Sequence, residues 1–213
     1  MRDKHLLERH FEDFMMCGGI PEFVLYQERS YLQNLVEDIL YKDIIAHNNI
    51  KHHSVIKDFF LLLMERSGKQ FSINKIANIL KITPDTAKRY LDLFAETYLV
   101  SMVSRYGKTN KMLLSPKKIY CADIGIRSHY TGFRDLGSLF ENYMYLQIKN
   151  NDVRYVYENS IELDFLVNKQ TLIEVKYGRE LNKKQLQLFD TFKAKKKFMI
   201  QSFQEIDEIA RKI

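Results

Sequence analysis

The segment Ile161–Lys176 reads IELDFLVNKQTLIEVK, which predicts two β-strands joined by a short polar turn. Asp164 lies in the first apolar run, and Glu174 and Lys176 lie in the second. Strand side chains alternate between two faces, so Glu162 shares a face with Asp164, and Glu174 with Lys176. If the two strands pair, the carboxylates of Asp164 and Glu174 converge at a shared edge. Burying two carboxylates is unfavourable without a compensating cation, so this hairpin predicts a divalent-metal site beside a lysine.

The elements around this hairpin are predicted to follow an α-β-β-β-α-β-α order. A helix over Leu139–Lys149 and a strand over Val153–Tyr157 precede it. A basic helix over about 182–193, a strand at Phe198–Gln201 and a last helix to Ile213 follow it. Strands with helices on both sides favour an α/β sandwich around a mixed sheet. We therefore expect an α/β fold, with this domain over residues 135–213.

The preceding residues are predicted to be mainly helical. Helical patterns cover residues 3–16, 30–45, 55–66, 73–80 and 84–98. Two extended runs follow, over 99–106 and 118–122, separated by the polar segment GKTNKMLLSP, which is predicted as a loop. Three helices with a tight turn between the last two, followed by a β-hairpin, are typical of a winged helix-turn-helix. We expect a helical segment over 1–50 and a winged-helix domain over 51–134.

Composition restricts the classes of protein that the chain can belong to. It has 213 residues, 46% of them hydrophobic, and a formal net charge of +6, which mildly favours a polyanionic partner. Cys17 and Cys121 lie far apart without metal-binding spacing, which is typical of a reducing cytoplasm. Apolar runs are too short to span a bilayer, and the charged N-terminus lacks a signal-peptide core. We expect a cytoplasmic protein with no membrane partner.

The predicted metal is Mg²⁺ or Mn²⁺. Two carboxylates, from Asp164 and Glu174, and the backbone carbonyl of Val175 are the oxygen ligands that such an ion prefers. Glu141, on the helix before the first strand, is the candidate for a third carboxylate. The amine of Lys176 would orient an attacking water or stabilise the transition state. The alternative is that these charges lie on the solvent face of an antiparallel strand and have no function.

A second candidate site is a DNA-binding surface on the predicted winged helix. Its basic residues would contact phosphates; they are Lys88, Arg89, Arg105, Lys108 and Lys111. Asp92 and Glu96, on the predicted reading helix, would repel the same phosphates. The alternative is that this helical module packs against a partner domain and that its charges are simply solvated.

At the hairpin residues the chain resembles the PD-(D/E)xK superfamily, which has the restriction-endonuclease-like fold. That resemblance covers about residues 137–202 and implies that Asp164 and Glu174 are metal ligands. It further implies that Lys176 is the catalytic lysine and that Glu141 is an auxiliary acid. Leu163 stands where the proline of the motif's name would lie.

A resemblance over nearly the whole chain is carried by GGIPEFV at Gly18–Val24, YCADIGI at Tyr120–Ile126 and GSLFEN at Gly137–Asn142, together with IELDFLV and LIEVKYG. These segments resemble the C-terminal part of a prokaryotic AAA-type ATPase family. In that family a nucleotide-binding domain precedes a winged helix and a restriction-endonuclease-like domain.

By that resemblance the ATPase domain is absent from this chain, which implies a truncated gene, a split partner or a fragment. The segment Gly107-Lys108-Thr109 looks like the end of a phosphate-binding loop, but Met102 stands where that loop needs glycine. We therefore expect no ATP hydrolysis by this polypeptide.

Two functions remain open at this point. The first is a DNA-binding, divalent-metal-dependent nuclease, which would be an Mg²⁺-dependent phosphodiesterase. The second is a non-catalytic DNA- or protein-interaction module that serves an ATPase supplied in trans. Oligomeric state and the choice between DNA and RNA do not follow from these residues.

Overall fold

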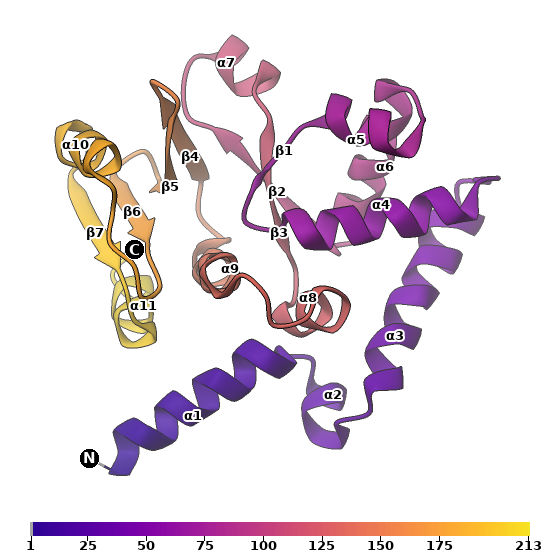
Figure 1. Ribbon diagram of the computed structural model, residues 1–213, viewed down its shortest axis with the longest axis horizontal. Helices are drawn as coiled ribbons and strands as arrows, with labels where there is room; N and C mark the ends of the chain where they lie inside the picture. The colour runs from indigo at the N-terminus through magenta and orange to yellow at the C-terminus, as the bar shows by residue number, and fades with distance from the viewer. Residues whose placement is uncertain (1) are drawn as a thin grey trace. The chain divides into compact units, whose positions relative to one another are not determined.

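The computed structural model describes residues 2–213, with the side chains of all these residues except 2–4, 29 and 207. The chain divides into two compact units. We call Met1–Met102 with Ile119–Arg134 unit 1, and Val103–Lys118 with Asp135–Ile213 unit 2. The fold is mixed α/β: a helical N-terminal half is followed by a seven-stranded mixed sheet with interspersed helices, in the strand order β1-β3-β2-β4-β5-β6-β7 (Figure 1).

Unit 1 is built mainly from helices. They are α1 (Arg2–Cys17), α2 (Pro21–Tyr26), α3 (Arg29–Asp38), its π-helical continuation η1 (Ile39–Ala46), α4 (His53–Arg66), α5 (Ile73–Leu80), α6 (Pro84–Glu96) and α8 (Ile124–Thr131). The short strand β1 (Gln70–Phe71) lies between α4 and α5. The five predicted helical segments are present, whereas α2 and α8 were not predicted. Thr83 caps α6 by accepting a hydrogen bond from the Thr86 N–H at 3.2 Å.

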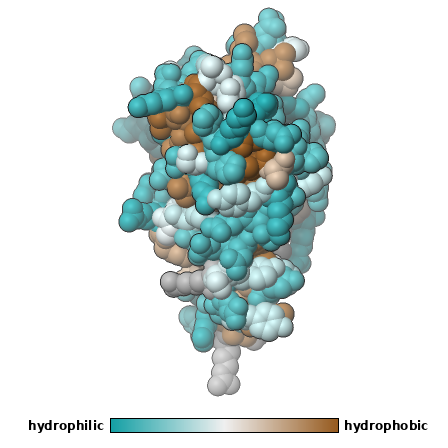
Figure 2. Space-filling model, turned by 90° about the vertical axis from the view of Figure 1, so that its right-hand side faces the viewer, coloured by the Kyte–Doolittle hydropathy of each residue, from teal (hydrophilic) through white to brown (hydrophobic). Residues whose placement is uncertain are grey.

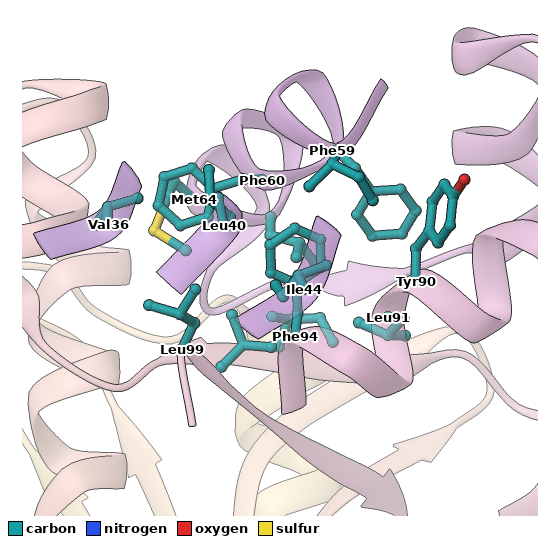
Figure 3. Close-up of a cluster of buried hydrophobic side chains, with 14 of the residues drawn as sticks. Val36, Leu40, Ile44, Phe59, Phe60, Met64, Tyr90, Leu91, Phe94 and Leu99 are labelled. Atoms are coloured by element: carbon teal, nitrogen blue, oxygen red, sulfur yellow. The ribbon is translucent and has the colours of Figure 1, made fainter. Parts of the chain in front are cut away.

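The core of unit 1 is aromatic and aliphatic (Figure 3). Phe59 on α4 stacks on Phe94 of α6, with ring centroids 5.6 Å apart and an interplanar angle of 11°. Phe60, the next residue of α4, packs edge-on against Tyr130 of α8 at 4.9 Å. Successive residues of one helix therefore bind two different partners, which fixes the rotation of α4 about its axis.

Two of the sequence segments that carry the family resemblance meet within unit 1. Asp123 caps α8 through the Ile126 N–H at 3.0 Å, and its other carboxylate oxygen accepts the Gly19 N–H at 2.8 Å. A Cβ atom on Gly125 would lie 2.0 Å from the carbonyl oxygen of Cys17. Glycine is therefore required where the start of α8 meets the end of α1.

Unit 2 contains the remaining elements. They are α7 (Thr109–Leu114), α9 (Leu136–Ile148), β4 (Val153–Glu158), β5 (Ile161–Val167), β6 (Thr171–Val175), α10 (Lys183–Thr191), β7 (Lys196–Ile200) and α11 (Phe203–Ala210). Strands β2 (Val100–Arg105) and β3 (Lys117–Cys121) contribute residues to both units. The elements from α9 to α11 occur in the predicted order.

One sequence-based expectation for this region is wrong. The polar segment between β2 and β3 was predicted as a loop, but residues Thr109–Leu114 form the short helix α7. The sequence Gly107-Lys108-Thr109 is therefore followed by a helix after all. Met102 still occupies the place of the first glycine of a phosphate-binding loop, so the motif remains incomplete.

Tight hairpins set the register of the central strands. β5 pairs antiparallel with both β4 and β6, while β2 runs parallel to β4 and β7 runs parallel to β6. Asn159-Ser160 is the two-residue loop between β4 and β5, and Asn168-Lys169 are the central residues of the turn 167–170 between β5 and β6; all four residues have positive φ, between 49° and 62°. These values are those of type I′ turns, whose twist matches that of the strands.

The ladder is interrupted at Asp164. The pairing of β4 with β5 shifts between Arg154↔Leu166 and Val156↔Leu163, so Asp164 and Phe165 together face the single residue Tyr155. The ladder between β5 and β6 extends no further toward Asp164 than Phe165↔Ile173. A bulge of this kind bends its strand and redirects a side chain.

Helices cover the strands of unit 2 through separate contacts. Phe189 of α10 packs in a cluster with Val156, Leu163, Leu166 and Leu172, while Tyr145 of α9 stacks on Phe165 at 6.4 Å. On the face of the molecule that Figure 2 shows, hydrophilic side chains predominate and hydrophobic ones form small patches. Within residues 2–213, no helix combines the length and the apolar character that crossing a bilayer requires.

Candidate functional site

The two carboxylates of the predicted site lie side by side in unit 2. Glu174 Oε2 accepts the backbone N–H of Asp164 at 3.0 Å, and Asp164 Oδ2 accepts the backbone N–H of Val175 at 2.9 Å. These two side-chain hydrogen bonds join β5 to β6 just beyond the end of their backbone ladder at Phe165↔Ile173. Asp164 is 5% exposed and Glu174 is fully buried.

Lys176 supplies the positive charge beside the carboxylates of Asp164 and Glu174. Its Nζ lies 2.7 Å from Glu174 Oε1 and 3.8 Å from Asp164 Oδ2. Burial and the neighbouring Asp164 carboxylate raise the pKa of Glu174 to about 8, although Lys176 opposes the shift. Burial lowers the pKa of Lys176, but Asp164 and Glu174 outweigh that effect and the net pKa is raised. The cluster therefore holds more negative charge than Lys176 compensates.

A second lysine, Lys118 of β3, lies at the centre of the remaining carboxylates. Its Nζ is 2.6 Å from Glu141 Oε1, 2.7 Å from Glu162 Oε1 and 3.3 Å from Asp164 Oδ1. The Lys118 side chain has no solvent exposure, whereas those of Glu141 and Glu162 are 13% and 27% exposed. Asp164 thus contacts both lysines and joins two ion clusters into one. We call these six residues the acidic site: Lys118, Glu141, Glu162, Asp164, Glu174 and Lys176.

Four of the sequence-predicted residues are therefore brought together: Glu141, Asp164, Glu174 and Lys176. Val175, predicted to offer its carbonyl, donates its N–H to Asp164. Lys118 and Glu162 were not predicted as site residues. Glu162 had a signal in the sequence, because it shares strand parity with Asp164. Lys118 had none: it follows Lys117 at the start of a strand and lies 46 residues from Asp164.

The donor set fits one hard cation better than an enclosed metal cage. Among the residues that the structure describes, no three His, Cys, Asp or Glu side chains are grouped so as to hold an ion. Asp164 and Glu174 supply adjacent carboxylate oxygens, which Lys118 and Lys176 also contact, whereas Glu141 and Glu162 are contacted by Lys118. Mg²⁺ characteristically takes one or two protein carboxylates and keeps several waters.

The residues predicted to contact DNA fall into both units. Lys88 and Arg89 are exposed on α6 of unit 1, and the Arg89 guanidinium lies 5.6 Å from the ring centre of Tyr90. In unit 2, Lys108 and Lys111 are exposed at α7. Arg105, at the end of β2, is half-buried, with its guanidinium 5.2 Å from the Tyr157 ring centre and hydrogen-bonded to the Tyr157 carbonyl.

Comparison with known proteins gives a family and two archaeal relatives. Two proteins of Methanocaldococcus jannaschii are similar to the chain. Uncharacterized protein MJ1544 is 29% identical over 199 residues, which is 84% of this chain and 44% of that protein. Uncharacterized protein MJ1637 is 26% identical over 217 residues, which is 92% of this chain and 46% of that protein. The chain thus spans less than half the length of these relatives. No solved structure shows significant similarity to the chain.

A family model described as a domain of unknown function, DUF8612, matches residues 8–137. The match includes Lys118 but ends before Glu141, Glu162, Asp164, Glu174 and Lys176. Because the matched residues make up more than half of the chain, the chain belongs to the DUF8612 family.

Proposed function

We propose that this chain is a DNA-binding, divalent-metal-dependent phosphodiesterase. The observation that carries the proposal is the convergence of Asp164, Glu174 and Lys176. The side chains of Asp164 and Glu174 bond to each other's strand, and one ammonium lies between them at 2.7 and 3.8 Å. A buried carboxyl group whose pKa is raised to about 8, next to a specific cation, is typical of the perturbed groups that cluster at catalytic sites.

The arrangement of elements supports the same proposal. The order α9-β4-β5-β6-α10-β7 is that of the restriction-endonuclease-like core, with Glu141 on its first helix. The helices α4, α5 and α6 followed by β2 and β3 have the order of a winged helix. The relatives are more than twice as long as the matched region, so they have room for a further domain. We propose that the chain acts in an AAA-type ATPase system, with the ATPase as a neighbouring domain or a partner in trans, and the greater length of the relatives is compatible with this.

Asp164 and Glu174, with the carbonyl of Val175, would hold Mg²⁺ or Mn²⁺. Such an ion lowers the pKa of a bound water and neutralises charge that develops on a phosphate. Lys176 places a point cation beside the same carboxylates, where it would stabilise the negative charge of the transition state. Lys118 fixes Glu141, Glu162 and Asp164 relative to one another, so the positions of these carboxylates are set before substrate arrives.

The second candidate is a non-catalytic interaction module, and Lys118 is the observation that favours it. A buried ammonium within 3.3 Å of three carboxylates already supplies much of the charge compensation that a metal would give. In that case the acidic site would stabilise unit 2, and binding of DNA or of a protein would depend on other surfaces.

The test is cleavage of supercoiled and linear DNA, and of RNA of the same sequence, with Mg²⁺ or Mn²⁺. Asp164→Asn, Glu174→Gln and Lys176→Met should each abolish cleavage. Glu158→Gln, at an exposed carboxylate of β4, should leave it unchanged. Isothermal calorimetry should detect metal binding in the wild type and none in Asp164→Asn. Absence of both cleavage and metal binding would overturn the enzyme proposal. Salt-dependent DNA affinity that survives Asp164→Asn would then support the interaction module.

A further inference from the structure

A cavity in unit 2 gathers four cationic side chains. Its volume is about 640 Å³, and it lies where β2 ends, beside β4 and the turn between β5 and β6. The residues that line it are Arg105, Tyr106, Gly107, Lys108, Thr109, Met112, Arg154 and Lys169. None of these lining residues, all of which the structure describes, is an Asp or a Glu. Cavities of about 300–1,000 Å³ are the size that small ligands and nucleotide units occupy.

Two of the four cations are fixed by the protein. Arg105 hydrogen-bonds to the Tyr157 carbonyl, and its guanidinium lies over the Tyr157 ring. Arg154 is tethered through its Nε to Asp152 Oδ1 at 2.7 Å and through a terminal nitrogen to Met112 Sδ at 3.1 Å. Arginines held in this way lose little conformational entropy when they bind a phosphate. Lys108 and Lys169 are exposed and add charge at the rim.

The backbone around the cavity is also specialised. The Tyr106 N–H donates to the Tyr155 carbonyl at 2.7 Å, so the chain still follows β4 at this point. Gly107 then takes a φ of +151°, which other residues rarely adopt, and α7 begins at Thr109. The Tyr106 ring is 39% exposed and rests edge-on against Phe192 at 6.1 Å. Its exposed surface offers a place for a base to stack.

The sheet connects this cavity to the acidic site. Arg105 pairs with Tyr155 of β4, and Tyr155 faces the bulge that contains Asp164. The backbones of Arg105 and Asp164 are thus two strand spacings apart, about 10 Å. Charged residues of the cavity and of the acidic site both act on the Tyr155 hydroxyl. Burial and Glu162 raise its pKa to about 12, while Arg105 and Lys118 oppose the rise. One nucleic-acid strand can therefore reach both places.

We propose that this cavity is a nucleotide subsite, which binds a phosphate and stacks the base of an unpaired nucleic-acid strand whose neighbouring phosphodiester lies at the acidic site. The link to the acidic site rests on the proposed phosphodiesterase function. The cations would hold the phosphate, and Tyr106 would stack on the base. A paired base cannot leave its helix to enter such a cavity without cost, so unpaired strands would bind more tightly than duplex.

The test measures binding of a fluorescein-labelled oligothymidylate to the full chain by anisotropy, in EDTA and at low salt, so that no turnover is needed. The double variant Lys108→Glu/Lys169→Glu should weaken binding at least tenfold. It should also reduce the slope of log affinity against log salt by about 1.4, since each phosphate contact on a single strand contributes about 0.7. Tyr106→Leu should weaken binding roughly five- to a hundredfold without changing that slope.

The matched control is Lys184→Glu/Lys212→Glu, which changes net charge equally at two exposed lysines that do not line the cavity. It should alter affinity less than threefold. Any of three results would overturn the subsite: an equal loss of affinity in the two double variants, no binding by the wild type, or tighter binding of duplex than of the unpaired strand. If Lys108→Glu/Lys169→Glu cleaves nucleic acid with an unchanged KM, the subsite proposal is overturned and the phosphodiesterase proposal is retained. Cavity-dependent binding without any cleavage would instead remove the phosphodiesterase and leave the subsite.

Discussion

Replacing Lys118 by methionine should destabilise unit 2 strongly. Methionine has nearly the same length and volume as lysine, so the substitution removes the charge with little change in packing. Three carboxylate oxygens lie 2.6, 2.7 and 3.3 Å from the Lys118 Nζ. Without the ammonium these carboxylates repel one another in a site that water hardly reaches.

The size of the effect follows from burial. Removing one partner of a buried ion pair costs about 3–5 kcal/mol, because the other charge remains buried and uncompensated. Lys118 has no exposure and compensates three carboxylates rather than one, so the upper part of that range is expected. For a chain of this length the loss corresponds to a decrease in Tm of roughly 6–20 °C.

Urea unfolding at pH 7.5 in EDTA, followed by circular dichroism, measures this loss directly. Lys42→Met is the control: the Lys42–Asp38 pair is 2.8 Å long, but its side chains are 71% and 62% exposed. An exposed pair contributes about 0–1 kcal/mol, so this variant should differ little from wild type. A Lys118→Met protein within 0.5 kcal/mol of wild type would refute this account of the acidic site.

Three further predictions concern other groups. The pKa of Glu174 is raised from 4.5 to about 8, so the folded protein binds this proton more tightly than the unfolded chain. Its contribution to metal-free stability is therefore full below about pH 4.5 and is lost as pH rises through 8. Urea titrations of Glu174→Gln in EDTA should lack that decline, and an unchanged pH profile would contradict the assignment. Gly125→Ala should lower the Tm strongly, because its Cβ would meet the Cys17 carbonyl at 2.0 Å. Gly137→Ala, which lies in α9 and has nothing nearer than 3.9 Å, should raise the Tm slightly; equal shifts would disprove the contact. Burial raises the pKa of the Cys121 thiol to about 12, so Ellman's reagent should modify Cys17 first and reach Cys121 only on unfolding.

Local pattern predicted the regular elements well. The bounds of α5 (Ile73–Leu80) agree with the sequence-based expectation, and β5 (Ile161–Val167) and β6 (Thr171–Val175) are the two strands expected within Ile161–Lys176, because each element has a clear period and a turn signal at its ends. The helices that were not predicted are six to eight residues long, too short for a clear period, and α8 also depends on a distant contact. The start of α8 shows this: Asp123, which caps it, also binds the Gly19 N–H, from a loop 104 residues earlier.

In the acidic site, too, some of the contacts could be predicted from the local sequence and others could not. Asp164, Glu174 and Lys176 belong to one hairpin, so their proximity follows from strand pairing and could be predicted. The bulge at Asp164 could not, although it lets each carboxylate bond to the opposite strand. Lys118 joins the site only because its side chain on β3 reaches Glu162 and Asp164 of β5, although β2 and β4 lie between these strands in the sheet. A lysine at the start of a strand is usually solvated, and nothing local marks this one as buried.

The charges of the acidic site make a prediction about its metal stoichiometry. Four carboxyl groups and two ammonium groups meet there: Glu141, Glu162, Asp164 and Glu174, with Lys118 and Lys176. With four ionised carboxylates the net charge is −2, so one divalent ion balances it and a second would leave the site positive. Because the pKa of Glu174 is about 8, that group is mostly protonated at pH 7 and must lose its proton to bind the ion. Calorimetry at pH 7 should therefore find one Mn²⁺ per chain, with an enthalpy that varies with the buffer as the release of nearly one proton requires. Two ions per chain would show that Lys118 does not remain as the internal counter-ion when metal binds, and an enthalpy independent of the buffer would show that Glu174 loses no proton on binding.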